Sequence, residues 1–438
     1  MGNHRFLPKV AAVGLLGLFT VPGSFATLSE RARPNIILII ADDLGMGDLG
    51  CYGAKDISSP NIDQVANNGV RFDRNYAYPV CSPSRASMLT GKFPEQLGIS
   101  SALMGEGGLA VGTQTMAHRF KAAGYRTALI GKWHLGYDLA RGPNRMGFDR
   151  FFGFRGGKID YFTHRDTAQK DDLGNPLGKH DLWRDELEVH RDGSYTTQLF
   201  TSEAVNFIRE QIGDPFFLTL AYNAPHYARP GVLQAPDDYI RKFAVNPAKP
   251  TSREIYRAMV SCMDDGVGEI LAALKERGLT EKTLVIFASD NGSDPKSGGS
   301  NGVLREGKWS VYEGGIRVPL MAIWPGKIAP SVQDAVLHCA DLLPTLLSAA
   351  GIPHTRGEFS GVDAWATFLN QEPTATRTLM FQFRNSRAVI DGKWKLVAPV
   401  DGRITGRLYD VSADPAESVD RSLEYPDVAA KLSKLLPP

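Results

Sequence analysis

Four short apolar runs, each followed by polar residues, constrain the fold of this 438-residue chain most strongly. The first run spans residues 35–40, is rich in β-branched side chains and leads into Ala41-Asp42-Asp43. A run that is apolar at nearly every position is typical of a parallel strand buried on both faces of its sheet. The other runs share this design and span residues 127–130, 216–221 and 284–288. Together they predict the centre of a parallel sheet.

Helical patterns separate these strands. Their start signals and closing glycines predict helices at residues 59–68, 115–123, 195–212 and 252–275. The alternation predicts an α/β fold in which helices sandwich a large, mostly parallel sheet. Ligands of such sheets bind beyond the carboxyl ends of the strands. We therefore expect the polar residues after the four strands to converge on one crevice.

The pattern changes after residue 352. Short alternating runs at 379–383, 387–390, 394–397 and 407–409 are joined by turn sequences, and a helical pattern spans 427–436. These features predict a small antiparallel sheet with one helix. We therefore predict a catalytic domain at 33–352 and a C-terminal α+β subdomain at 353–438.

The N-terminus has the features of a secretory signal peptide. Basic residues precede an apolar stretch at 10–21, and Ser24-Phe25-Ala26 has the small-x-small form of a cleavage site. The apolar stretch is too short for a comfortable membrane span. The sequence thus predicts a signal peptide at 1–26, cleavage after Ala26, and a periplasmic or secreted mature enzyme with no membrane anchor.

The charge and the cysteine content of the chain limit the classes of partner and the covalent cross-links to expect. The formal charge of +1 gives no reason to expect nucleic acid, so an anionic substrate has to be bound by a few local cations. The four cysteines, at 51, 81, 262 and 339, have no spacing typical of a disulfide framework. We expect at most one disulfide if Cys81 is consumed by oxidation.

The run Cys81-Ser82-Pro83-Ser84-Arg85, extended by Ala86-Ser87-Met88-Leu89-Thr90-Gly91-Lys92, is the most specific motif. A proline in the first turn and a glycine at the end frame a helix. The unpaired N–H groups of its first turn favour an anion, and Arg85 adds a forked donor that suits sulfate or phosphate. A small buried thiol is the alternative for Cys81 alone. The surrounding motif favours a reactive group beside an anion site.

This motif resembles the signature of type I sulfatases, in which the cysteine is oxidised to formylglycine. The resemblance implies an alkaline phosphatase-like fold, a formylglycine-generating maturation enzyme as a partner, and hydrolysis of sulfate esters. Lys92 departs from the family, which usually has arginine there. Leu408-Tyr409-Asp410, followed by Asp414-Pro415-Ala416-Glu417, resembles the closing motif of sulfatase C-terminal subdomains.

Two strand ends carry candidate metal ligands. Asp42, Asp43, Asp290 and Asn291 offer only oxygen atoms, which favour calcium first and magnesium second. Either pair alone is more often a cap or a turn, but two pairs in one crevice strengthen the metal interpretation. The positions match the calcium ligands of sulfatases, and the resemblance implies that formylglycine at Cys81 adds another ligand to one Ca²⁺ ion.

The resemblance also assigns roles to basic residues near the strand ends. Arg85, Lys132 and Lys308 are implied to neutralise the sulfate. One hydroxyl of the formylglycine hydrate attacks sulfur, and His226, assisted by Lys308, protonates the leaving alcohol. His134 then removes the proton of the second hydroxyl, which expels sulfate. A lone lysine or histidine is usually a surface charge or a satisfied polar partner, and the matched motifs outweigh that interpretation.

The substrate is less constrained. The segment Asn223-Ala224-Pro225-His226 followed by Leu233-Gln234-Ala235-Pro236 resembles the branch related to N-acetylgalactosamine 4-sulfatases and bacterial glycan sulfatases. We therefore expect a sulfated galactose or N-acetylgalactosamine unit of a polysaccharide or oligosaccharide, with His164 as a sugar contact. A broad aryl sulfatase is the alternative.

Three further interpretations compete with a sulfatase. A phosphatase or phosphodiesterase relative shares the expected fold, but typically has two zinc ions, more histidine ligands and a serine or threonine nucleophile. A binding protein without catalysis would keep only the anion pocket. A redox role for Cys81 lacks a nearby second cysteine.

Overall fold

The structure is a computed structural model that describes residues 1–3, 33–105, 107–167, 178–372, 377–400 and 406–436. The predicted signal peptide therefore lies almost entirely outside the described residues. The chain divides into two units, Met1–Arg33 and Pro34–Pro438, and the second contains every helix and strand of the described residues. The proposed boundary near residue 352 stays a prediction.

A ten-stranded sheet forms the centre of the second unit. Its five middle strands are parallel, whereas β10 on one side and β6 on the other run antiparallel to their neighbours. In spatial order the strands are β11 (Ser331–Gln333), β2 (Val70–Phe72), β10 (Leu320–Ile323), β9 (Thr283–Ser289), β1 (Asn35–Ala41), β8 (Phe216–Ala221), β4 (Arg126–Lys132), β5 (Arg150–Phe154), β6 (Trp183–Arg184) and β7 (Leu187–Glu188). The predicted mostly parallel sheet is confirmed.

The register of the parallel strands aligns their carboxyl ends. Ala41 of β1 pairs with Ser289 of β9, and Gly131 of β4 pairs with Ala221 of β8. The next residues along β1, β9 and β4 are Asp42, Asp290 and Lys132. Pairing alone therefore brings two candidate metal ligands and one candidate cation to the same edge of the sheet.

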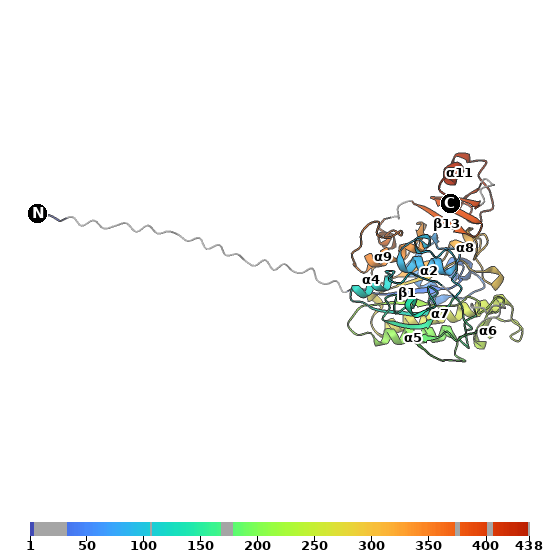
Figure 1. The fold of residues 1–438 in the computed structure, drawn as a ribbon, viewed down its shortest axis with the longest axis horizontal. Coiled ribbons are helices and arrows are strands. Elements are labelled where there is room, and N and C mark those ends of the chain that lie inside the picture. The colour runs from blue at the N-terminus through green and yellow to red at the C-terminus, as the bar shows by residue number, and fades with distance from the viewer. Residues whose placement is uncertain (4–32, 106, 168–177, 373–376, 401–405, 437–438) are drawn as a thin grey trace. The chain divides into compact units, whose positions relative to one another are not determined.

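Helices cover both faces of the sheet because its central strands are apolar on both sides. Alternate residues of β1 enter two different cores, Ile36, Leu38 and Ile40 on one face and Ile37 and Ile39 on the other. The first core includes residues of α2 (Cys81–Thr90), α4 (Met116–Ala122) and α9 (Leu342–Ala349). The second includes residues of α1 (Pro60–Asn67), α5 (Thr196–Glu210) and α7 (Ser252–Glu276). Figure 1 shows these two layers on opposite sides of β1.

The C-terminal segment forms the predicted antiparallel sheet. Its strands, in order, are β13 (Thr378–Phe383), β14 (Ser386–Asp391), β15 (Trp394–Pro399) and β16 (Arg407–Asp410). Phe381 and Ile390 join the first core of the main sheet, whereas Val389, Leu396 and Leu408 pack on Leu432 of α11 (Pro426–Ser433). One face of this small sheet thus belongs to the core of the catalytic region.

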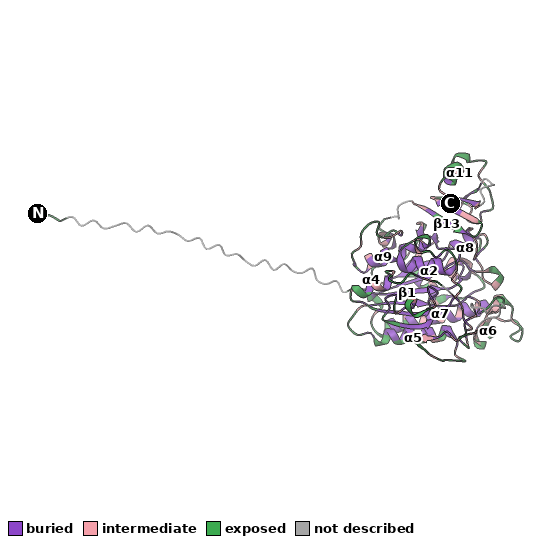
Figure 2. Ribbon diagram, viewed as in Figure 1, coloured by how far each residue is buried: buried purple, intermediate pink, exposed green. Residues whose placement is uncertain are grey.

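Smaller elements complete the fold. The pair β3 (Asn75–Tyr76) and β12 (Leu337–His338) forms a two-stranded sheet. The short helices are α3 (Pro94–Leu97), α6 (Asp237–Phe243), α8 (Glu313–Ile316) and α10 (Trp365–Phe368). Figure 2 shows burial concentrated in the sheet and its facing helices, with α6 and α11 more exposed. Within the described ranges, no helix has the length and apolarity needed to span a bilayer.

Candidate active site

Cys81 begins α2, directly after the extended residue Val80, and Gly91 ends the helix in the left-handed conformation at φ 66°. All ten residues of α2 are buried, and Cys81 itself is 2% exposed. Burial raises the pKa of the Cys81 thiol even though Lys132 and Lys308 act in the opposite direction. The thiol is therefore a poor nucleophile as it stands, because the reactive form of cysteine is the thiolate.

Three buried ion pairs connect the strand ends around Cys81. Lys132 Nζ lies 2.6 Å from Asp42 Oδ2. Lys308 Nζ lies 2.7 Å from Asp43 Oδ1. Arg85 Nε donates to Asp290 Oδ2 at 2.8 Å. Each of these six residues is at most 6% exposed, so water screens their charges weakly.

The same cluster contains oxygen atoms that form no hydrogen bond with any described residue. These are Asp42 Oδ1 and Asn291 Oδ1, both fully buried. The amide Nδ2 of Asn291 is already used, because it donates to Asp43 Oδ1 at 2.7 Å and to the Gly292 carbonyl. A buried oxygen without a donor costs free energy unless it finds another partner, and a cation is such a partner.

The spacing of the ligand atoms fits one divalent ion. Asp42, Cys81 and Asp290 each place a ligand atom within 4.8 Å of the others, and so do Asp42, Asp43 and His226. Oxygen atoms on opposite sides of a calcium ion lie up to about 5 Å apart. The residues present therefore fit a hard metal ion held mainly by oxygen, as the sequence predicts.

Charge balance makes this cluster receptive to an anion. Three carboxylates and three cations sum to zero charge within the six residues. A bound divalent ion would bring the sum to about +2, which favours a sulfate ester carrying one negative charge. No broad basic surface is needed for this selectivity.

His134 and His226 differ in which ring nitrogen is hydrogen-bonded to a backbone carbonyl. His134 Nε2 lies 3.0 Å from the Leu103 carbonyl, so Nε2 carries the hydrogen, and Nδ1 is buried without a described partner. His226 Nδ1 lies 2.7 Å from the Tyr227 carbonyl, and its Nε2 lies 3.6 Å from Asp43 Oδ2. Burial lowers the pKa of both imidazoles well below the usual value, and Lys132 next to His134 and Lys308 next to His226 lower it further. Both rings are therefore neutral and available as bases.

Three of the nine described non-glycine residues with a positive φ lie at or next to residues of this cluster. Asp43 and His134 have φ values of 66° and 58°, in the left-handed region that non-glycine residues rarely adopt. Trp309, which follows Lys308, has φ 74°. Such conformations persist only when the surrounding structure holds them, and they cluster at functional sites.

A close approach of two loops holds Asp290 and Asn291 in place. A Cβ atom on Gly292 would lie 1.8 Å from the Gly314 carbonyl, and Gly292 N donates to the Gly315 carbonyl at 3.0 Å. The Glu313-Gly314-Gly315 segment therefore acts as backbone support for the metal ligands. Its carboxylate has another role, because Glu313 Oε1 accepts from Lys395 Nζ of β15 at 2.9 Å.

His164 differs from the other predicted site residues. It is fully buried, its Nε2 lies 3.0 Å from the Ser194 carbonyl, and its ring faces His180. The structure does not bring it into the cluster around Cys81. A sugar could reach this buried ring only if the surrounding chain moved, so the geometry gives no support to a direct sugar contact.

Several supporting residues escaped the sequence analysis. Tyr161 OH lies 2.6 Å from the Asn223 carbonyl and 2.7 Å from the His226 carbonyl, and thus holds the loop that carries His226. Tyr256 OH lies 2.9 Å from the Asp43 carbonyl and 2.8 Å from Asp48 Oδ2. No motif marks these tyrosines, because their partners, three backbone carbonyls and the Asp48 carboxylate, are distant in the sequence.

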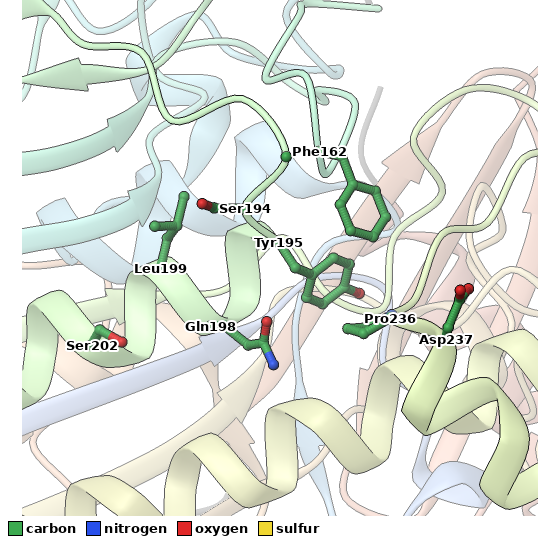
Figure 3. Close-up of a pocket in the computed structure, with 9 residues that line it drawn as sticks. Phe162, Ser194, Tyr195, Gln198, Leu199, Ser202, Pro236 and Asp237 are labelled. Atoms are coloured by element: carbon green, nitrogen blue, oxygen red, sulfur yellow. The ribbon is translucent and has the colours of Figure 1, made fainter.

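Two hollows lie in this region. One, of about 600 Å³, is lined by Val80 and Pro83 beside Cys81, by Trp309, and by Arg384 of the β13–β14 turn. A second, of about 540 Å³, lies at the start of α5 and is lined by Phe162, Ser194 and Tyr195 (Figure 3). The lining of the first hollow includes sequence neighbours of Cys81 and Lys308 but no residue of the Cys81 cluster itself.

The fold and the site are those expected of a hydrolase that binds an anionic ester at the carboxyl ends of a parallel sheet. Comparison with known proteins identifies the class of hydrolase. The sulfatase family model matches residues 34–352. The chain belongs to the sulfatase family, in its formylglycine-type glycan sulfatase branch, and is a sulfuric ester hydrolase.

Among curated relatives, human arylsulfatase A is 34% identical, and the alignment covers 93% of this chain and 83% of the relative. N-acetylgalactosamine-6-O-sulfatase of Bacteroides thetaiotaomicron is 30% identical, and the alignment covers 99% of this chain and 98% of the relative. The crystal structure of Ps i-CgsB in complex with k-i-k-neocarrahexaose has a TM-score of 0.82, 32% identity and 92% coverage of both chains.

A phosphonate monoester hydrolase of Agrobacterium radiobacter shares the fold at 20% identity, with a TM-score of 0.64 and coverage of 92% and 94%. The predicted alkaline phosphatase-like fold class, with its smaller antiparallel sheet and helix, is confirmed by the architecture together with these structural neighbours.

Proposed function

We propose that this enzyme is a calcium-dependent sulfatase that uses a formylglycine made from Cys81. Its substrate is a sulfate ester on a galactose or N-acetylgalactosamine unit of a polysaccharide or oligosaccharide. The observation that carries the proposal is the buried cluster in which Cys81, Asp42 and Asp290 place ligand atoms within 4.8 Å of one another beside fixed cations.

The relatives support a sulfated carbohydrate. One is named for N-acetylgalactosamine-6-O-sulfate hydrolysis, and one solved relative is in complex with a neocarrahexaose. The first hollow adds a physical argument, because its walls combine the Trp309 ring with the Arg384 guanidinium 5.4 Å from the ring centroid. An aromatic face packs against the apolar side of a sugar, and a guanidinium binds a further sulfate.

The metal would be held by Asp42, Asp43, Asp290, Asn291 and residue 81. When bound there, Ca²⁺ would withdraw charge from the sulfate and favour ionisation of a hydroxyl at residue 81. Formylglycine hydrate at residue 81 would supply two hydroxyl groups, one to attack sulfur and one to allow sulfate to leave. The donor set is consistent with calcium because its unpartnered atoms are oxygens.

The chain's own residues prepare the first displacement. Arg85, Lys132 and Lys308 lie within the buried cluster and would neutralise the sulfate oxygens. Although burial lowers it, the adjacent Asp43 carboxylate raises the pKa of Lys308 above its usual value, so Lys308 stays protonated. His226 would gain its proton only when the negative sulfate ester binds, and would then donate it to the leaving alcohol.

The second step needs a base, and His134 is arranged as one. Its Nε2–H is fixed by the Leu103 carbonyl, which leaves Nδ1 as the acceptor. Ser82 Oγ donates to the His134 carbonyl at 3.1 Å, so the residue after the nucleophile position holds the backbone of this histidine. His134 would accept the proton of the second hydroxyl as sulfate leaves.

The test of the activity is sulfate release from a chromogenic sulfate ester, with and without a chelator of divalent ions. We expect activity that the chelator removes and that added Ca²⁺ restores more fully than Mg²⁺. Activity that persists unchanged after complete chelation would contradict the metal part of the proposal. Hydrolysis of phosphate esters alone would contradict the sulfatase part.

The substrate is tested with a panel of defined 4-sulfated and 6-sulfated galactose and N-acetylgalactosamine oligosaccharides beside a simple aryl sulfate. Arg384→Ala should raise KM for a multiply sulfated oligosaccharide about tenfold while leaving kcat and the aryl sulfate kinetics unchanged. The exposed Arg421→Ala is the control. An equal effect on both substrates would favour a broad aryl sulfatase.

We propose that the predicted signal peptide directs export, and that the enzyme is periplasmic or secreted and is modified by its maturation enzyme before its fold buries Cys81. Sequencing the N-terminus of protein recovered from the periplasm or medium tests this. A mature chain that begins at Thr27 is expected. An intact N-terminus on protein that remains in the cytoplasm would contradict it.

A further inference from the structure

A second group of ligand-type side chains lies outside the cluster around Cys81. It contains three of the nine histidines, His164, His180 and His190, together with Glu188 and Asp192. His164, His180 and Asp192 each place a ligand atom within 4.8 Å of the others, and so do His180, Glu188 and His190. The sulfatase reaction uses none of these five residues.

His164 and His180 each have a ring nitrogen without a hydrogen-bond partner among the described residues. His164 is fully buried, and because its Nε2–H donates to the Ser194 carbonyl, Nδ1 keeps a lone pair with no described partner. The His180 side chain is 7% exposed, its Nδ1 forms an ion pair with Glu188 Oε1 at 3.0 Å, and its Nε2 forms no hydrogen bond with a described residue. A histidine that is fixed through one nitrogen by a carbonyl and free at the other has the arrangement of a metal ligand.

The exposed half supplies carboxylates at suitable distances. Glu188 Oε1 lies 3.0 Å from His180 Nδ1, and Asp192 Oδ2 lies 3.9 Å from His190 Nδ1. Ligand atoms at about 2.0 Å from a tetrahedral metal ion are about 3.3 Å apart, so these distances need only small rotations of exposed side chains. The rings of His180 and His190 have centroids 4.2 Å apart.

The donor set differs in kind from that around Cys81. Imidazole nitrogens with one or two carboxylates suit Zn²⁺ and its transition-metal neighbours, whereas a set dominated by oxygen suits Ca²⁺. The two groups of side chains therefore suit different kinds of metal ion.

We propose that His164, His180 and Asp192, completed by His190, form a second metal site that binds one Zn²⁺ ion. The site joins the turn at 160–164 to the β6–β7 hairpin and the segment that leads into α5. It has a structural role. Ser194, whose carbonyl holds His164, also lines the hollow of Figure 3.

The turn that would be fixed leads to the active site. His164 N donates to the Asp160 carbonyl at 3.0 Å, and Tyr161 in the same turn contacts the His226 carbonyl. Gln234 holds the turn itself at two points, because its side chain accepts from Tyr161 N and donates to Asp160 Oδ2 at 2.7 Å. Zinc binding should therefore stiffen the support of His226 without touching the substrate.

The test uses the full mature chain with any purification tag removed, stripped of metal and then saturated with Ca²⁺. Isothermal titration with Zn²⁺ should show one ion per chain with a submicromolar Kd. Co²⁺ in its place should give the intense visible absorption of a tetrahedral site. His180→Asn should abolish both signals, and His190→Ala should weaken Zn²⁺ binding at least about tenfold.

His354→Ala is the matched control, because this histidine lies outside the group and pairs with Ser348 and Asp363. It should bind Zn²⁺ like the wild type. If His180→Asn does not fold, the His190→Ala variant still tests the proposal, because His190 is exposed. The proposal is overturned if Ca²⁺-saturated protein binds no Zn²⁺, or if binding is unchanged in the folded His180 or His190 variants.

Discussion

Two groups of buried charges in this molecule show how a structural cluster differs from a catalytic one. In the first, Lys395 Nζ lies 2.9 Å from both Glu313 Oε1 and Glu417 Oε1, and all three side chains are fully buried. Glu417 Oε2 accepts from Glu313 N at 2.7 Å, and Tyr76 OH donates to Glu313 Oε2 at 3.0 Å. These contacts fasten the C-terminal sheet to the catalytic region.

The cluster around Cys81 has equally buried ion pairs, but it also contains buried polar atoms that have neither a hydrogen bond nor an ion pair shorter than 3.9 Å among the described residues, whereas Glu417 Oε1 of the Lys395 cluster is paired at 2.9 Å. Asp42 Oδ1, Asn291 Oδ1 and His134 Nδ1 form no hydrogen bond with the described residues. Burying polar atoms without partners lowers stability, so such atoms are retained where a ligand or a proton supplies the partner. The difference predicts that changes in the Cys81 cluster remove activity, whereas changes in the Lys395 cluster remove stability.

The largest effect is expected from Cys81→Ala. Without the precursor of formylglycine the nucleophile is absent, so sulfate release should fall by several orders of magnitude while the protein folds normally. Initial rates and a thermal unfolding curve check both parts. Cys262→Ala, at a cysteine that is also buried but lies in α7, should keep its activity. Full activity of the Cys81→Ala enzyme would contradict the proposed mechanism.

His134→Ala should separate the two chemical steps. If His134 removes the proton that allows sulfate to leave, the variant should carry out the first displacement and then retain sulfate on the protein. Intact mass spectrometry after incubation with substrate detects the added mass. His338→Ala, at another buried histidine, should show none. Equal amounts of bound sulfate in both variants, or in neither, would contradict the role given to His134.

Lys395→Met should affect stability rather than chemistry. Removal of the lysine leaves two buried carboxylates without their cation, which costs about 3–5 kcal/mol. Urea unfolding measures this loss, and the remaining folded protein should hydrolyse substrate at the wild-type kcat. Lys393→Met is the control, because the Lys393 side chain is 55% exposed and water screens its pair with Asp410. Equal losses for both variants would remove the distinction between the clusters.

The smallest effect concerns pH. Burial raises the pKa of Glu417 above 4.5, despite the opposing charge of Lys395. A raised folded pKa gives a contribution that is complete below the unfolded value and is lost as pH rises through the folded value. The stability of the wild type relative to Glu417→Gln should therefore fall as pH rises above 4.5, the usual pKa of glutamate.

Glu424, which is exposed, provides the control for this measurement. Arg421 lowers its pKa, so the wild type should not lose stability relative to Glu424→Gln as pH rises. Urea unfolding of the three proteins across the pH range checks the sign. A wild type that gains stability over Glu417→Gln with rising pH would contradict the assignment.

Local patterns were enough to predict most of the fold. The apolar run at 35–40 and its three counterparts became the parallel strands, because their burial on both faces is visible in composition alone. The helix that begins at Cys81 and ends before Gly91 was also predictable from its proline and glycine. The same logic placed Asp42 and Asp290 at one edge of the sheet.

Long-range contacts could not be predicted in this way. Lys395 and Glu313 are 82 residues apart, and nothing near either residue indicates the pair. His164 lies in a segment whose residues suggested a sugar contact, yet its burial beside His180 depends on a fold that the segment does not encode by itself. The left-handed backbone of Asp43 likewise depends on contacts with Tyr256 of α7 and with Asp290, the residue after β9.

The central claim is that sulfate hydrolysis depends on an aldehyde made from Cys81. Mass spectrometry of the peptide that contains residue 81 tests it most directly, in preparations made with and without a formylglycine-generating enzyme. We predict that specific sulfatase activity rises in proportion to the fraction of residue 81 present as formylglycine. Full activity in a preparation whose residue 81 is entirely unmodified cysteine would contradict the account.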